Sequence, residues 1–214
     1  MSATAMDNVR SATPGQVRRS PSVPAHWPIR RHVAAAETTP AGPLHLVEVT
    51  VPAKTNLTLH VGPAHEEWGG RHALDTIYCA IGVNDVVTAT AKTPGSGFSL
   101  ELSGEHLGDL ASSGSDMRRN HAVLALFAIA RAAGREPDVA LHVDKHIPVG
   151  AGLGGGSADA AATLLAVNTL WGLHWPIERL RDIAATLGAD MPFCLEGGYA
   201  HGTGFGERII PLED

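Results

Sequence analysis

Alternation of apolar and polar residues dominates the middle of the chain. The stretches "LHLVEVTV" from Leu44, "TNLTLHV" from Thr55 and "DVALHVDKHI" from Asp138 carry apolar side chains at every second position. This period of two is typical of strands with one buried face. "LDTIYCAI" and "VVTAT" alternate as well, and "GVND" between them has the composition of a turn, so the pattern predicts two paired strands. "GFSLELSG" predicts one more strand.

A helical period replaces the alternation in three later segments. Residues 120–134 form an apolar-periodic run that Gly134 closes, residues 157–171 are rich in alanine, and Pro176 opens a third run that stops at Gly188. Short strands at 199–201 and 208–211 complete the pattern. Because strands come first and helices follow, we expect an α+β fold, with the helices on one face of a largely antiparallel sheet.

Composition and charge limit the classes of function. Residues 1–43 are rich in Ser, Thr, Pro and Ala without either period, which predicts a disordered N-terminal extension, or a transit peptide, before a folded domain at 44–214. The net charge is -6, and the basic residues gather near the N-terminus, so the acidic remainder argues against nucleic-acid binding. No apolar run reaches the ~20 residues that cross a bilayer. Cys79 and Cys194 lack metal-like spacing, which predicts buried thiols in a reducing cytoplasm.

The segment "IPVGAGLGGGSADAA" from Ile147 gives the clearest indication of a functional site in the sequence. It carries five glycines between Gly150 and Gly156 and leads directly into the alanine-rich helix. A helix N-terminus attracts anions, and glycines let backbone amides approach phosphate oxygens closely. Ser157 can cap the helix or contact a phosphate or its metal. A flexible linker is the alternative, but linkers do not usually join a strand directly to a strong helix.

Two better-known nucleotide motifs fit this loop poorly. Gly150, Gly152 and Gly155 satisfy G-x-G-x-x-G, but the preceding strand alternates, whereas the first strand of a dinucleotide-binding fold reads continuously apolar. The P-loop motif requires G-K-[ST] after the glycines, and it is absent, as are the motifs of protein kinases.

The same loop resembles the phosphate-binding loop of the GHMP small-molecule kinases. Two further segments agree with that family in the same order: "VPAKTNLTLHV" from Val51 resembles its opening strand, and "LGADMPFCLEGGYAHGTGFGE" from Leu187 resembles a later segment. The resemblance covers residues 47–214. It implies the family's N-terminal ATP-binding domain, of the ribosomal protein S5 domain 2-like fold, at 44–214, with the C-terminal domain largely missing from this chain.

The resemblance also implies roles for individual residues. Alternation by itself places Lys54 and Asn56 on the same face of a strand, and Asp190 follows a helix end on a loop that can aim its carboxylate into a cleft. In the family, the lysine and aspartate that match Lys54 and Asp190 are the catalytic pair, and the positions of Asn56 and His72 hold the substrate. ATP and Mg²⁺ are the implied cofactors, and the metal ligands stay unknown. The phosphate-binding residues implied are Pro148, Gly150, Gly152, Leu153, Gly154, Gly155, Gly156 and Ser157.

The implied reaction is ATP-dependent phosphorylation of a hydroxyl of a cytidine-diphosphate-linked methylerythritol, a step of non-mevalonate isoprenoid precursor synthesis in the cytoplasm. Arg71 departs from the family, which has a cytosine-stacking aromatic in D-G-Y-H where this chain reads "WGGRH". A guanidinium can stack in its place.

Two alternatives stay open: a nucleotide-binding remnant without activity, and a sister GHMP kinase for another alcohol. We expect the remaining histidines to be surface or hydrogen-bonded groups (His121, His142 and His146).

Overall fold

The computed structural model describes residues 9–13, 16–19, 44–105, 107 and 117–213. Its strands are β1 (Val9–Thr13), β2 (Gln16–Arg19), β3 (Leu46–His65), β4 (Arg71–Ala91), β5 (Ser99–Gly104), β6 (Val139–Lys145), β7 (Tyr199–Thr203) and β8 (Arg208–Pro211). Its helices are α1 (His121–Ala133), α2 (Gly155–Leu170), α3 (Ile177–Leu187) and α4 (Met191–Glu196), with short 3-10 turns η2 (Glu66–Trp68) and η4 (Met117–Arg119).

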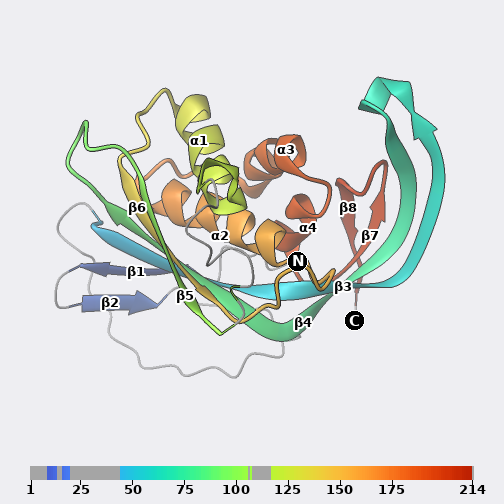
Figure 1. Cartoon of the computed structure of the whole chain (residues 1–214), viewed down its shortest axis with the longest axis horizontal. Helices are drawn as coiled ribbons and strands as arrows, with labels where there is room; N and C mark the ends of the chain where they lie inside the picture. Colours follow the sequence, from blue (N-terminus) through green and yellow to red (C-terminus); the bar gives the residue numbers. More distant parts are fainter. Residues whose placement is uncertain (1–8, 14–15, 20–43, 106, 108–116, 214) are drawn as a thin grey trace.

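One twisted sheet carries the helices on a single face (Figure 1). The strand order is β2-β1-β3-β4-β6-β5, while β7 pairs with the first part of β4 and β8 pairs with β7. Only the β5–β6 pair of the described strands is parallel. The α+β class and the one-sided placement of the helices are therefore confirmed.

The long hairpin of β3 and β4 corrects one prediction. The segment "GVND" does not turn the chain, because "LDTIYCAI" and "VVTAT" both belong to β4 and pair with β3 instead of with each other. The register shifts between Pro52 and Ala53, so that Pro52 lies opposite Asn84 and Ala53 opposite Ile81. The turn-like residues thus form a bulge, a device that bends a strand beside a functional site.

The three predicted helices are present with small shifts at their ends. Asn120 caps α1 through its side chain, which accepts a hydrogen bond from the amide of Ala122, and Gly134 ends this helix in the left-handed conformation. Helix α2 begins at Gly155, two residues before the predicted start, because Gly154 with φ 71° is the last residue outside it. Helix α3 lies between Pro176 and Gly188, as predicted.

The sequence did not predict α4. We expected a loop at Asp190, but a six-residue helix begins directly after it and is buried along its whole length. Pro192 made a helix seem unfavourable at this point of the sequence. Proline is nevertheless tolerated in the first helical turn, because a backbone amide there would have no helical partner. Asp190 is therefore fixed by a packed helix and not carried on a free loop.

Helix α2 forms the centre of the core. It packs against β3, β4, α1 and α4, and nearly all of its side chains are buried, including those of Leu164 and Leu165. A helix that is surrounded in this way needs small residues for close packing, which explains its run of alanines at 160–162. The sheet and α2 together therefore fix the position of the glycine loop that precedes this helix.

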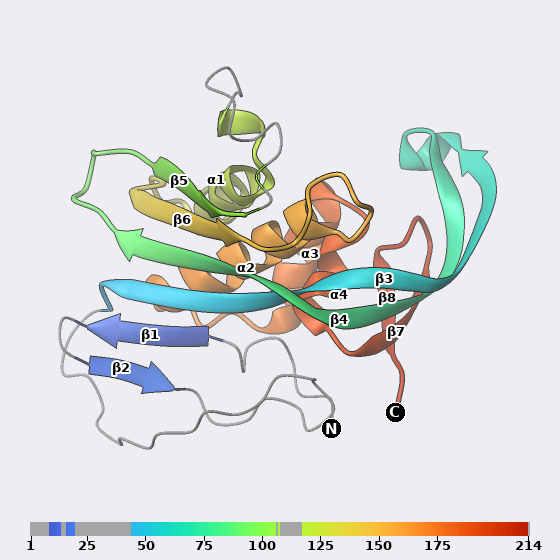
Figure 2. The same cartoon turned by 60° about the horizontal axis from the view of Figure 1, so that its bottom comes forward.

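Two strands lie within the segment 1–43 that we expected to be disordered. Strand β1 pairs with the outer edge of β3 and β2 pairs with β1, which extends the sheet (Figure 2). Both are too short for a visible period in the sequence. The rest of that predicted extension lies outside the described residues. Among the helices that the structure describes, none is long and apolar enough to cross a membrane.

Candidate active site

The glycine loop follows β6 and ends at the N-terminus of α2. Gly150, Gly152 and Gly154 all have φ between 71° and 77°, a region that L side chains rarely adopt. A Cβ atom on Gly150 or Gly152 would meet nothing within 4 Å, so open space lies above this part of the loop. Because the first amides of a helix lack helical partners and α2 has no acidic residue in its first turn, this end favours an anion.

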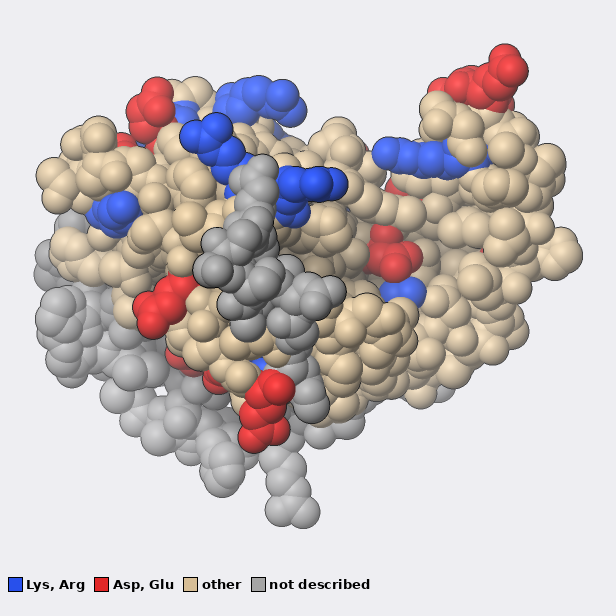
Figure 3. All heavy atoms as spheres, viewed as in Figure 1, with Lys and Arg blue, Asp and Glu red and all other residues tan. Residues whose placement is uncertain are grey.

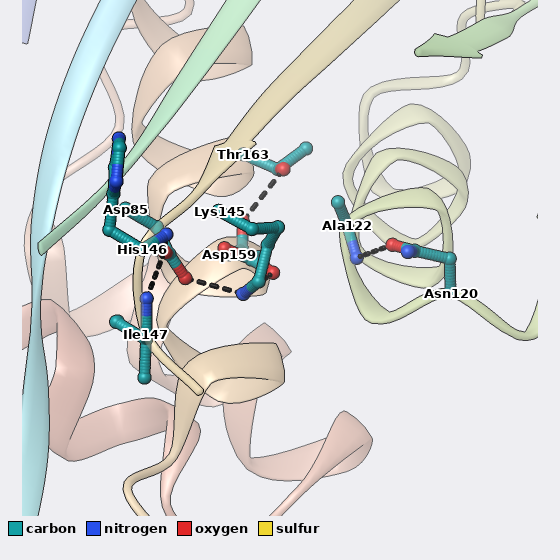
Figure 4. A network of polar contacts seen from close by, with 8 residues as sticks. All are labelled: Asp85, Asn120, Ala122, Lys145, His146, Ile147, Asp159 and Thr163. Atoms are coloured by element: carbon teal, nitrogen blue, oxygen red, sulfur yellow. Dashed lines mark hydrogen bonds and ion pairs between the residues drawn. The ribbon is translucent and has the colours of Figure 1, made fainter. Parts of the chain in front are cut away.

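A buried group of charges supports the loop from below. Lys145 donates hydrogen bonds to Asp85 and, at 2.7 Å, to Asp159 of α2 (Figure 4). Asp85 also accepts hydrogen bonds from the backbone amides of His146 and Ile147, at 2.6 and 2.8 Å. All three charged side chains are at most 5 % exposed. They tie the bulge of β4, the end of β6 and the first turns of α2 to one another.

Glycine is required at 154 because Lys54 passes directly beside it. A Cβ on Gly154 would lie 2.7 Å from Cγ of Lys54. The backbone confirms this contact, since the amide of Lys54 donates to the carbonyl oxygen of Leu153 at 2.9 Å. Strand β3 therefore touches the glycine loop at the residue that we predicted to be catalytic.

Lys54 connects the loop to a polar cluster. Its Nζ lies 3.0 Å from Oδ2 of Asp190 and donates to Oδ1 of Asn56 at 2.8 Å. The amide of Asn56 in turn donates to Thr76 at 2.7 Å, and Thr76 donates to the carbonyl oxygen of Thr58 at 2.6 Å. Lys54 and Asn56 thus share one face, as their spacing predicted, and Asp190 lies beside Lys54, as the resemblance implied. The Asp190 side chain stays 32 % exposed, so it is open to a ligand.

Tyr78 completes this cluster, and the sequence did not single it out. Its hydroxyl donates to Oδ1 of Asp190 at 2.9 Å. Burial, followed by the charge of Asp190, raises the pKa of Tyr78 far above its ordinary value of 10.0. Burial likewise raises the pKa of the Cys194 thiol above its ordinary value, which makes this cysteine unreactive. Cys79 is buried as well, and both cysteines are free thiols, as predicted.

His72 lies apart from the cluster. It is exposed on the distal part of the hairpin, with Nδ1 at 2.9 Å from the carbonyl oxygen of Gly62. Within the described residues, no hydrogen bond or ion pair joins it to Lys54, Asn56 or Asp190. In the space-filling view the end of the hairpin stands away from the helical body and leaves a notch (Figure 3). A substrate that contacts both His72 and Asp190 must therefore extend along the hairpin.

Arg71 stacks on an aromatic side chain of the protein, Phe205. Its guanidinium carbon lies 4.4 Å from the centroid of the Phe205 ring, and Trp68 meets the same ring edge-on at 6.1 Å. A planar cation and two aromatic rings are thus assembled around the residue that precedes His72 in β4. The guanidinium stacking that we considered for this position is realised within the protein itself.

The buried charges left one readable signal in the sequence. Lys145 falls in the buried phase of its strand, in line with Val139, Leu141 and Val143. A lysine at such a position requires buried partners. The partners themselves could not be named, because Asp85 looked like a turn residue.

Replacement of Lys145 by methionine should destabilise the protein by about 3–5 kcal/mol, because two carboxylates would remain buried without a cation. Urea unfolding followed by circular dichroism measures this change. Lys92→Met is the matched control, since Lys92 is partly exposed and donates only to a backbone oxygen at 3.4 Å. A loss below about 1 kcal/mol for Lys145→Met would contradict the supporting role of this group.

Asp159 should make stability depend on pH. Burial raises its pKa from 3.8 to about 7 in the folded protein. The folded state then binds more protons than the unfolded state between these values, so stability falls as the pH rises from about 4 to about 7. The urea midpoints of wild type and Asp159→Asn should lie close together near pH 4, where the carboxyl group is uncharged like the amide. They should diverge toward pH 7, where the wild type has lost stability. A difference that is constant with pH would contradict the shift.

Comparison with known proteins agrees with this geometry. Residues 120–198 match the family model described as GHMP kinases N terminal domain. The 4-diphosphocytidyl-2-C-methyl-D-erythritol kinase of Bifidobacterium adolescentis is 77% identical over 171 residues, which are 80% of this chain and 56% of that protein. The enzyme of the same name from Bifidobacterium longum subsp. infantis is 82% identical over 166 residues, 78% of this chain and 52% of that protein.

A solved structure shows the same likeness in three dimensions. The crystal structure of 4-(cytidine 5'-diphospho)-2C-methyl-D-erythritol kinase matches with a TM-score of 0.59 and 37% identity, over 77% of this chain and 55% of that one. The chain spans about half the length of the curated relatives that it matches. On sequence and on structure, the chain belongs to the GHMP kinases and contains the N-terminal domain of that family.

Proposed function

We propose that this chain contributes the ATP site and the catalytic pair of a kinase that phosphorylates a hydroxyl of 4-diphosphocytidyl-2-C-methyl-D-erythritol. The observation that carries the proposal is the contact of Lys54 with both parts of the site. Its amide meets the glycine loop at Leu153, and its ammonium meets the carboxylate of Asp190. Relatives at 77–82% identity bear the name of this kinase, which supports the choice of substrate.

The glycine loop would bind the phosphates of ATP. Its exposed part leaves space above Gly150 and Gly152, and the first turn of α2 directs free amides toward the same region. Phosphoryl transfer needs alignment and charge neutralisation more than covalent chemistry from the protein. The residues proposed to bind the phosphates are Pro148, Gly150, Gly152, Leu153, Gly154, Gly155, Gly156 and Ser157.

Asp190 would act as the base for the acceptor alcohol. Its carboxylate accepts the hydroxyl proton as that oxygen bonds to the γ-phosphorus, and the bond from this phosphorus to the departing ADP oxygen breaks. Each carboxylate oxygen has two lone pairs, so the contacts with Lys54 and Tyr78 leave room for the alcohol. The ammonium of Lys54 stabilises the negative charge that develops on the transferred group.

Magnesium would enter with the nucleotide. Mg²⁺ usually keeps several waters and takes one or two protein oxygens besides phosphate, and when bound it neutralises phosphate charge. Among the described residues, no group of three or more His, Cys, Asp or Glu side chains is arranged for a metal ion. Ser157 is half-buried in the first turn of α2 and would offer a hydroxyl to the metal or to a phosphate.

The far end of the substrate would lie along the hairpin toward His72. Asn56 holds Lys54 near the reacting hydroxyl, while His72 and the stacked Arg71 and Phe205 present flat polar and aromatic groups farther out. These groups suit a nucleobase, which binds by stacking and by hydrogen bonds at its edge. The two free buried thiols, together with a substrate and a nucleotide that are soluble phosphate esters, also favour a cytoplasmic location for the protein.

Purified protein incubated with Mg-ATP and this substrate should release ADP, and Asp190→Asn should lower the rate by at least about a hundredfold, the usual contribution of a general base. Asp182→Asn on the exposed side of α3 is the matched control. A substrate panel that includes mevalonate and homoserine separates this activity from that of a sister kinase. ATP binding without turnover of any alcohol would contradict the proposal and favour a nucleotide-binding remnant.

A further inference from the structure

The hydroxyl of Tyr78 touches Asp190 directly, and the proposed function gives this contact no task. Tyr78 lies on β4 and is 1 % exposed, and its hydroxyl donates to Oδ1 of Asp190 at 2.9 Å. The other carboxylate oxygen, Oδ2, faces Lys54 at 3.0 Å. The two oxygens of Asp190 are thus divided between a neutral donor and a cation.

The position of the Tyr78 ring is fixed by packing. Its ring stacks on Phe193 of α4 with centroids 4.8 Å apart and planes 20° from parallel. A Cβ on Gly202 would lie 2.5 Å from the ring, and a Cβ on Gly206 would lie 2.8 Å from the hydroxyl oxygen. Two glycines therefore give this side chain its space, and the hydroxyl cannot easily turn away from Asp190.

Asp190 needs such a partner because of its place in the chain. It directly precedes α4, where an aspartate usually turns back to cap the helix amides, yet its side chain makes no capping hydrogen bond. Without Tyr78, the ion pair with Lys54 would be the only contact among those described that orients the carboxylate. An ion pair has little directional preference, so it would leave the carboxylate free to rotate toward the ammonium.

The hydroxyl also remains a donor under all working conditions. Burial and the neighbouring charge of Asp190 raise the pKa of Tyr78 well above 10.0, so the phenol keeps its proton. The hydrogen bond therefore runs from Tyr78 to the carboxylate of Asp190.

We propose that Tyr78 is a positioning residue for the proposed phosphoryl transfer, whose hydroxyl holds the Asp190 carboxylate turned toward the acceptor alcohol. The inference rests on the proposed function. A phenylalanine would keep the stack on Phe193 and fill the same space beside Gly202, so packing alone does not require the hydroxyl.

Tyr78→Phe should lower kcat by about ten- to a hundredfold, as expected for the loss of a hydrogen bond to a charged group, and leave the KM for ATP within about twofold. Tyr199→Phe is the matched control, because it removes the same hydroxyl from an exposed tyrosine at the start of β7. A kcat for Tyr78→Phe within twofold of wild type, or a loss confined to the KM for ATP, would overturn the proposal.

A spectroscopic measurement tests the contact without any turnover. The chain has two tyrosines, so Tyr199→Phe leaves Tyr78 as the one source of a tyrosine signal. In that background, the ¹³Cζ resonance of labelled Tyr78 at pH 7 should move on Asp190→Ala and stay in place on Asp182→Ala. An unmoved resonance overturns the proposal, whereas absence of ADP release by the unmodified chain overturns the proposed function and leaves this readout intact.

Discussion

The contact between β3 and the glycine loop at Gly154 is the constraint on which the rest of the site depends. Lys54 passes where the side chain of any other residue at 154 would stand, and its amide is hydrogen-bonded to the loop. This contact fixes the N-terminal end of α2 relative to Lys54, whose ammonium pairs with the carboxylate of Asp190. The proposed phosphoryl transfer needs this arrangement to be fixed, because phosphate donor and acceptor alcohol must meet in line.

Buried charges hold this geometry in place. Lys145, Asp85 and Asp159 are buried together beneath the loop, where an apolar cluster of the same size would often be at least as stable. Their hydrogen bonds, however, join a strand bulge, a strand end and a helix start, which apolar packing cannot align as directionally. The arrangement indicates that the position of the loop, and not only its stability, depends on buried charge.

Periodicity was sufficient to predict the architecture but not its connections. Alternation and helical period located β5, β6, α1 and α3 nearly to the residue, because each turns its less exposed residues to one face. The "GVND" segment misled, since turn-forming residues also form bulges, and Asp85 is buried there by partners 60 residues away. Helix α4 was missed because six buried residues show no period.

The site was predicted where residues share a strand or a loop. Alternation alone places Lys54 and Asn56 on the same face of β3. The glycines indicated the loop that leads into α2, and the binding of phosphate there stays a prediction. Tyr78 and Thr76 could not be found in this way, because their roles arise from the pairing of β4 with β3 and from the packing of α4. The structure shows where these side chains lie, and the roles proposed for Lys54, Asn56, Asp190, His72 and the individual loop residues stay predictions.

Calorimetric titration of ATP into Gly154→Ala tests the central claim most directly. Gly134→Ala is the matched control, because Gly134 also has a positive φ, at 62°, and a Cβ there would meet nothing within 4 Å. The account predicts at least about a tenfold loss of ATP affinity for Gly154→Ala, beyond the strain that both variants share. Equal ATP affinity in the two variants would contradict it, since the contact between Lys54 and the loop would then not set the phosphate site.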